Sequence, residues 1–132
     1  MRGVAYIGVM QALEERGILP QVQRVAGTSA GAIVATFAAM RIPHTRWADI
    51  LRTMDLSTIM NRDGARIRFH NLARLESEFG MFSTEPFYDW FQGIIAEHCG
   101  GNGLATFRDF HQRGFLDLAV VASNLSTRQE KV

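Results

Sequence analysis

A glycine-rich segment at residues 27–31 limits the possible folds of this chain more than any other part of it; it reads Gly-Thr-Ser-Ala-Gly. The preceding residues, 22–26, are too few for a helix and contain β-branched valine, which predicts a strand. The following residues, 32–40, are apolar on every face, which predicts a helix buried against several neighbours. The chain must therefore turn sharply from a strand into a central helix.

Two further helices are predicted on either side of this segment. Apolar residues at helical spacing predict a helix over residues 3–16, with Gly17 and Pro20 as stop signals. After Pro43 breaks the chain, a third helix is expected over residues 46–54.

The C-terminal half adds two helices and a strand. An aromatic helix over residues 85–98 begins with proline in its first turn and ends at a run of glycines. Thr106 and Asp109 have the spacing of a capping box for a short helix that closes at Gly114. An apolar strand is expected over residues 116–122. Strands that alternate with helices predict an α/β fold with a parallel sheet.

Composition narrows the function classes. The chain has 132 residues, 47% of them hydrophobic and 20% charged, which fits one globular domain. A net charge of +1 makes nucleic acid an unexpected partner. Cys99 is the single cysteine, so no intramolecular disulfide can form.

The longest apolar run is about half of the ~20 residues that a membrane-spanning helix needs. The N-terminal stretch has the pattern of an amphipathic helix and not that of a signal peptide. We expect a soluble, cytoplasmic chain.

The glycine-rich segment also matches G-x-S-x-G, the pattern of a nucleophile elbow. Such an elbow lifts a serine hydroxyl clear of the sheet, and the positive end of the following helix stabilises a developing oxyanion. We expect both glycines to be needed because a Cβ at either would collide as the strand reverses. A plain helix cap and a phosphate-binding loop are the alternatives, although the usual phosphate-loop patterns are absent. The elbow would consist of Gly27, Thr28, Ser29, Ala30 and Gly31.

Beyond this motif, the chain resembles the patatin-like phospholipases, serine acyl hydrolases that use a Ser-Asp dyad. Residues 2–18 match the family's [RK]-G start and the helix that follows its oxyanion loop. Residues 25–32 read Val-Ala-Gly-Thr-Ser-Ala-Gly-Ala and match its nucleophile segment. Residues 80–87 and 116–126 are similar to two later family segments. The resemblance covers nearly the whole chain.

The resemblance implies a three-layer α/β fold with a mainly parallel central sheet, of which residues 1–132 form a partial domain. It assigns Ser29 as the nucleophile and leaves only Arg2 and Gly3 to represent the oxyanion loop. The first strand and the glycines of that loop are missing, and Met1 is interpreted as an internal methionine of a longer protein. The family's dyad aspartate lies far downstream, beyond Val132. Asp63 stands in a D-G-A triplet, which we interpret as an ordinary turn instead of the dyad base.

The expected function is lipid degradation by a hydrolase that cleaves carboxylic esters through Ser29, with no metal or cofactor. The substrate would be a lipid or another acyl ester, with peripheral contact to a membrane surface. A serine acyltransferase and a catalytically dead remnant that acts as an interaction module are the alternatives. The isolated chain is expected to be inactive because the glycine loop and the base region are absent.

Several other residues have a functional interpretation beside a plainer structural one. Any of the four histidines could complete a Ser-His-Asp triad, and the adjacent His98 and Cys99 could form a nucleophile pair, but a helix end explains that pair better. Four arginines after residue 60 could meet lipid headgroups or simply form a solvated loop. Aromatic residues near the 85–98 helix could line an acyl channel or form core. These groups are His44, His70, His98 and His111; Arg62, Arg66, Arg68 and Arg74; and Phe82, Phe87, Tyr88, Trp90 and Phe91.

Overall fold

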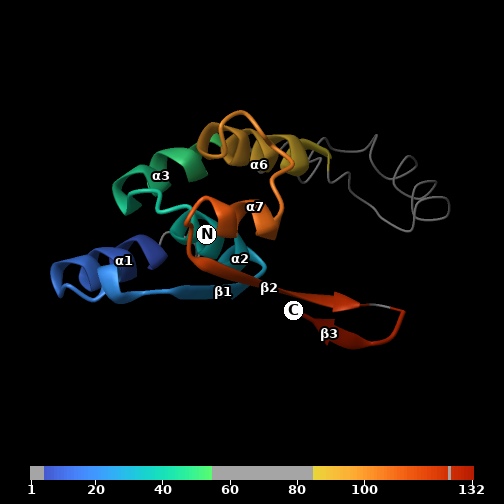
Figure 1. The fold of residues 1–132 in the computed structure, drawn as a ribbon, viewed down its shortest axis with the longest axis horizontal. Coiled ribbons are helices and arrows are strands. Elements are labelled where there is room, and N and C mark those ends of the chain that lie inside the picture. The colour runs from blue at the N-terminus through green and yellow to red at the C-terminus, as the bar shows by residue number, and fades with distance from the viewer. Residues whose placement is uncertain (1–4, 55–84, 125) are drawn as a thin grey trace, which may run out of the picture. The chain divides into compact units, whose positions relative to one another are not determined.

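The computed structural model describes residues 5–54, 85–124 and 126–132 of the chain (Figure 1). These residues form two compact units. The first contains the chain up to Leu51 and again from Ala105 onward, and the second contains the stretch from Arg52 to Leu104.

The first unit carries the sheet and most of the described helices. In chain order its elements are α1 (Ala5–Glu15), the short 3₁₀ helix η2 (Leu19–Gln21), β1 (Arg24–Thr28), α2 (Ala30–Ala39), most of α3 (His44–Thr53), α7 (Phe107–Gln112), β2 (Asp117–Asn124) and β3 (Gln129–Lys131).

The sheet of this unit has the strand order β1-β2-β3 and mixes both kinds of pairing. β1 and β2 are parallel, with Arg24 opposite Asp117 and Thr28 opposite Val121. β2 continues past the end of β1, where its last three residues pair antiparallel with β3. The predicted α/β fold is confirmed, in the form of a small mixed sheet. The strand β3 is not indicated by the sequence pattern.

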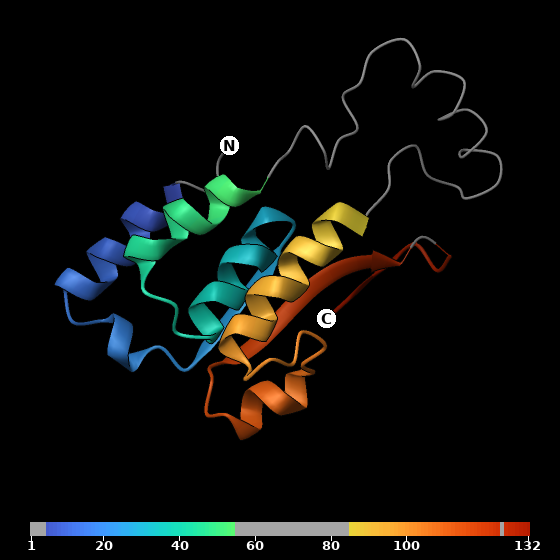
Figure 2. The same ribbon diagram turned by 90° about the horizontal axis from the view of Figure 1, so that it is seen from above.

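Helix α2 lies along β1 and β2 and forms the centre of the core, as Figures 1 and 2 show. Its residues 34–39 are all buried, and Phe37 and Ala39 are completely so. Thr36 is the one polar residue in this run, and its hydroxyl donates a 2.8 Å hydrogen bond to the Ala32 carbonyl. The burial predicted from the all-apolar sequence of this helix is therefore confirmed.

Helix α3 is anchored through Trp47, which is completely buried. The indole Nε1 of Trp47 donates a 2.9 Å hydrogen bond to the Ile42 carbonyl. Its ring meets Phe37 of α2 edge-on, with centroids 6.0 Å apart. One side chain thus joins the helix to the core by both apolar area and a satisfied polar group.

Helix α7 begins with the predicted capping box. The Thr106 hydroxyl accepts a hydrogen bond from the Asp109 amide at 3.3 Å, and the Asp109 carboxylate accepts from the Thr106 amide at 2.7 Å. The Thr106 hydroxyl also donates a 2.8 Å hydrogen bond to this carboxylate. The hydrogen bonds that the carboxylate accepts from the Thr106 backbone amide, first, and from the Thr106 hydroxyl, second, lower the pKa of Asp109 below its ordinary value.

The second unit contains α6 (Glu85–His98), whose bounds agree with the predicted aromatic helix. Phe87, Trp90 and Phe91 form one cluster, with ring centroids 5.7–6.0 Å apart. The Trp90 indole donates a 2.9 Å hydrogen bond to the Thr53 hydroxyl. The aromatic residues of α6 therefore contact one another, while Tyr88 is 53% exposed.

Candidate active site

Ser29 occupies the junction between β1 and α2, with backbone angles φ 54° and ψ −130°. Most non-glycine residues avoid this part of conformational space, and holding one there costs about 1–3 kcal/mol. The contacts of the surrounding strand and helix must therefore stabilise this conformation. A sharp, strained strand-to-helix turn is the geometry expected of a nucleophile elbow.

Gly27 is required by the close approach of the strand to the first turn of α2. A Cβ at this position would lie 2.2 Å from the Gly31 carbonyl oxygen and 2.6 Å from the Ala32 amide nitrogen. Both contacts are with backbone, which cannot move aside easily. The expected collision is thus confirmed at Gly27.

At Gly31 the same expectation is wrong. A Cβ there would meet only the Tyr6 hydroxyl, at 3.6 Å, which is an ordinary van der Waals contact. The reason is that the close approach involves the backbone of Gly31, not the space into which its own side chain would project. The contact also places the Tyr6 hydroxyl of α1 beside the first turn of α2, a neighbour that no sequence pattern indicates.

The Ser29 side chain does not cap the helix that it precedes. It makes no capping hydrogen bond, and Ser29 is exposed together with its neighbours Thr28 and Ala30. The Ser29 carbonyl instead accepts a 2.9 Å hydrogen bond from the Ala32 amide. The exposed hydroxyl therefore lies at the positive end of the α2 dipole, where the first amides of a helix have no intrahelical partner.

His111 lies at the opposite end of the sheet from Ser29. Its Nδ1 is 3.8 Å from the Asp117 carboxylate, which also lies 3.4 Å from the Arg24 Nε. Arg24 and Asp117 are register partners at the start of β1 and β2, whereas Ser29 follows the last residue of β1. At about 3.3 Å per residue, the separation is roughly 16 Å. His111 and Asp117 are a histidine–aspartate pair, but the pair is too distant to activate Ser29.

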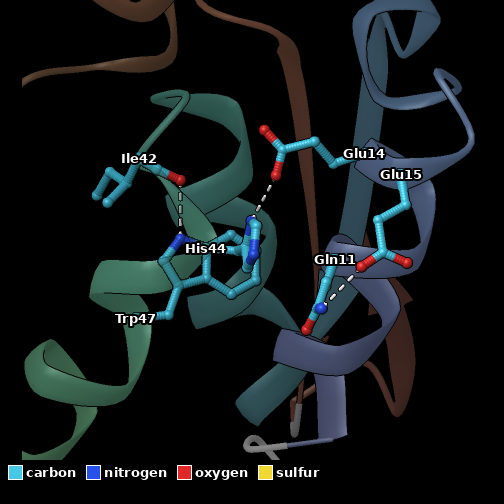
Figure 3. Close-up of polar contacts among 6 residues, drawn as sticks. All are labelled: Gln11, Glu14, Glu15, Ile42, His44 and Trp47. Atoms are coloured by element: carbon cyan, nitrogen blue, oxygen red, sulfur yellow. Dashed lines mark hydrogen bonds and ion pairs between the residues drawn. The ribbon is translucent and has the colours of Figure 1, made fainter.

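His44 is likewise remote, because it follows the C-terminal end of α2 while Ser29 precedes its N-terminal end. The ten residues of α2 separate them by about 15 Å. Its Nδ1 lies 3.0 Å from the Glu14 carboxylate of α1, as Figure 3 shows. His44 therefore bridges the start of α3 to α1 instead of facing the elbow.

His98 and Cys99 are at the end of α6 in the second unit. The His98 Nδ1 lies 2.9 Å from the Ile94 carbonyl of its own helix, and Cys99 is completely buried. This arrangement agrees with a helix end and gives no access for a substrate to the thiol.

The remaining predicted site residues lie outside the described residues. They are Arg2 and Gly3 of the oxyanion loop, Asp63 and His70, the arginines Arg62, Arg66, Arg68 and Arg74, and Phe82. Within the described residues, no three His, Cys, Asp or Glu side chains gather in a way that could hold a metal ion. None of the helices in the described ranges is both long and apolar enough to cross a bilayer.

Comparison with known proteins identifies the family. The family model for patatin-like phospholipase matches residues 1–131. An uncharacterized Bacillus subtilis protein, YqhO, is 30% identical over 131 residues, which cover 96% of this chain and 41% of that protein. The triacylglycerol lipase ptl3 of Schizosaccharomyces pombe is 51% identical over 39 residues, 30% of this chain and 8% of the lipase. The chain thus spans about two fifths of the first relative and less than a tenth of the second. No solved structure matches significantly. The chain belongs to the patatin-like phospholipase family.

Proposed function

We propose that this chain supplies the nucleophile of a lipid acyl hydrolase and that Ser29 is this nucleophile. The observation that carries the proposal is the strained backbone of Ser29, at the point where β1 turns into α2. The backbone contact at Gly27 and the exposure of Ser29 support the same role. A backbone outlier next to a helix N-terminus is a feature that folding alone does not favour.

In the proposed reaction, the Ser29 Oγ forms a bond to the ester carbonyl carbon while its proton passes to a base. The carbonyl electrons move onto oxygen, and amides at the start of α2, that of Ala30 first, donate to this oxyanion. The C–O bond to the alcohol then breaks, and the alcohol leaves with the proton. Water repeats the sequence on the acyl-serine and releases the acid.

The base and the rest of the oxyanion hole are assigned by family resemblance. The family uses an aspartate as the base, and Arg2 with Gly3 would belong to the loop that faces the oxyanion. The substrate class is a carboxylic ester of a lipid, which agrees with the name of the yeast relative, a triacylglycerol lipase. Because such esters reside in lipid phases, we expect turnover at a membrane or droplet surface.

A fluorophosphonate probe tests the proposal, because it labels an activated serine without needing turnover. The protein that contains this chain is compared as wild type, Ser29→Ala and Ser123→Ala by intact mass after equal exposure to the probe, because the chain by itself is expected to be inactive. Ser123 is the matched control, since it is an exposed serine of β2. We expect labelling of the wild type and of Ser123→Ala, and at least a hundredfold slower labelling of Ser29→Ala.

Labelling that persists in Ser29→Ala would exclude Ser29 as the reactive residue. Absence of labelling in a wild-type protein that circular dichroism shows to be folded would favour a catalytically dead remnant. A second experiment separates hydrolysis from acyl transfer. An acceptor alcohol is added to an active preparation, and the amounts of free acid and of newly formed ester are measured. A hydrolase must give mainly the free acid.

A further inference from the structure

A cavity lies in the first unit at the end of α2 that is remote from Ser29. Its volume is about 210 Å³. Residues of α1, η2, α2, the start of α3 and the residue before β2 line it. The lining residues are Met10, Glu14, Leu19, Ala38, Arg41, Ile42, Pro43, His44 and Leu116. Because α2 is about 15 Å long, this cavity is separate from the elbow.

The walls of the cavity are apolar and firmly held. Ala38, Ile42 and Leu116 are each at most 9% exposed. The Leu116 amide donates a 3.0 Å hydrogen bond to the Ala39 carbonyl, which ties the chain before β2 to the end of α2. A cavity with such walls favours an apolar ligand body over water.

Three charged or ionisable side chains contribute to its lining, and two of them are already engaged. The Glu14 carboxylate lies 3.0 Å from the His44 Nδ1, and the His44 side chain is only 13% exposed (Figure 3). Arg41 is exposed and has no ion-pair partner within the described part of the chain. The guanidinium of Arg41 is therefore the charge available to a ligand.

The backbone of Arg41 is fixed at the end of α2 in a conformation that is unusual for a residue with a side chain. The Arg41 amide donates to the Ala38 carbonyl and the Ile42 amide to the Phe37 carbonyl, both at 3.0 Å. These two hydrogen bonds form a Schellman motif that ends α2, and Arg41 occupies its left-handed position with φ 56°. Glycine is the usual residue there because a side chain is disfavoured. The Schellman motif thus fixes the backbone from which the Arg41 side chain extends at the cavity.

We propose that this cavity binds the carboxylate of a short- to medium-chain fatty acid. The alkyl chain would lie against the apolar walls, and the carboxylate would accept hydrogen bonds from the Arg41 guanidinium. A 150 Å³ apolar cavity accommodates a benzene-sized molecule, so about 210 Å³ suits an acyl chain of roughly six to eight carbons. The binding site is independent of Ser29 chemistry. That the ligand is also a reaction product rests on the proposed function.

Calorimetric titration with sodium octanoate, below its micelle-forming concentration, tests the proposal on the folded chain. We expect saturable binding to the wild type, binding at least tenfold weaker in Arg41→Gln, and no binding of acetate or octylamine. Arg128→Gln is the matched control, because Arg128 also has a positive φ of 55° and is exposed in the turn before β3. Ser29→Ala should bind octanoate like the wild type, which separates this site from the active site.

Three outcomes would overturn the proposal. They are octanoate heat that does not saturate, equal binding by Arg41→Gln and the wild type, or octylamine binding as tightly as octanoate. Carbon-13 methyl spectra give a second readout that does not depend on any variant folding. Octanoate must shift the Met10 methyl resonance, whereas shifts only at methionines outside the cavity would contradict the assignment.

Discussion

At the scale of single residues, three non-glycine residues in the described part of the chain have a positive φ, and two of them flank the same helix. Ser29 stands at φ 54° before α2, and Arg41 stands at φ 56° after it. Both flank the most deeply buried helix of the first unit. A rigid helix can maintain strain at its two ends, which makes both ends suitable for presenting a reactive or binding side chain.

Gly27→Ala should destabilise the chain strongly. The new Cβ would lie 2.2 Å from the Gly31 carbonyl oxygen, so the strand or the helix must shift. We expect a loss of about 2–4 kcal/mol in the free energy of unfolding, measured by urea denaturation.

Gly31→Ala is the matched control for that substitution. Its Cβ would meet only the Tyr6 hydroxyl at 3.6 Å, and alanine is the better helix former. We expect a change within about 1 kcal/mol. Equal losses in the two variants would show that the backbone of β1 does not approach the first turn of α2 at Gly27.

At the scale of secondary-structure elements, the sequence predicts an element correctly where the residues that define its ends are close together in the chain. The capping box of α7 needs only Thr106 and Asp109, and the bounds of α6 agree with its sequence signals. The strand before the elbow is expected from the sequence at residues 22–26, but β1 runs from Arg24 to Thr28. Its bounds are set by pairing with β2, almost a hundred residues later in the chain.

The capping box predicts an acid-dependent contribution to stability. The pKa of Asp109 is lowered in the folded chain by hydrogen bonds from Thr106, whereas in the unfolded chain it returns to about 3.9. The ionised carboxylate therefore stabilises the fold above that ordinary value, and this contribution is lost as the pH falls through the lower folded pKa.

Melting temperatures recorded between about pH 6 and pH 2 test this dependence. Wild-type stability should fall more steeply below about pH 4 than that of Asp109→Asn. Thr106→Ala removes the hydroxyl donor to the carboxylate and should flatten the curve in part, with a loss of about 1 kcal/mol at neutral pH. Parallel curves for the wild type and Asp109→Asn would contradict the assignment.

At the scale of the whole molecule, the parallel register of the sheet decides which polar groups can meet. It brings His111 beside Asp117 and Arg24, and it places Ser29 at the other end of β1. A histidine–aspartate pair and Ser29, the proposed nucleophile, therefore lie in one unit without forming a triad. The length of α2, about 15 Å, separates Ser29 from the cavity beside Arg41.

His111→Gln and His44→Gln should each leave the reactivity of Ser29 unchanged within about twofold, because both imidazoles are about 15 Å away. The measurement is the rate of fluorophosphonate labelling, with Ser29→Ala as the negative control. A loss of labelling in either histidine variant, in a protein that remains folded, would support a triad. For His111 it would contradict the parallel register of β1 and β2, and for His44 it would contradict the separation along α2.

Sequence alone was enough to establish the α/β class, the buried character of α2, the capping box and the likeness to patatin-like phospholipases. These properties follow from local spacing, from apolar patterning and from motifs whose residues are neighbours. Only the three-dimensional arrangement showed the positive φ of Ser29 and the steric requirement for glycine at position 27 but not at position 31. It also set the bounds of β1, revealed β3, and placed His44 and His111 far from Ser29. Each of these depends on backbone or side-chain atoms that meet through folding, and no local pattern specifies such contacts.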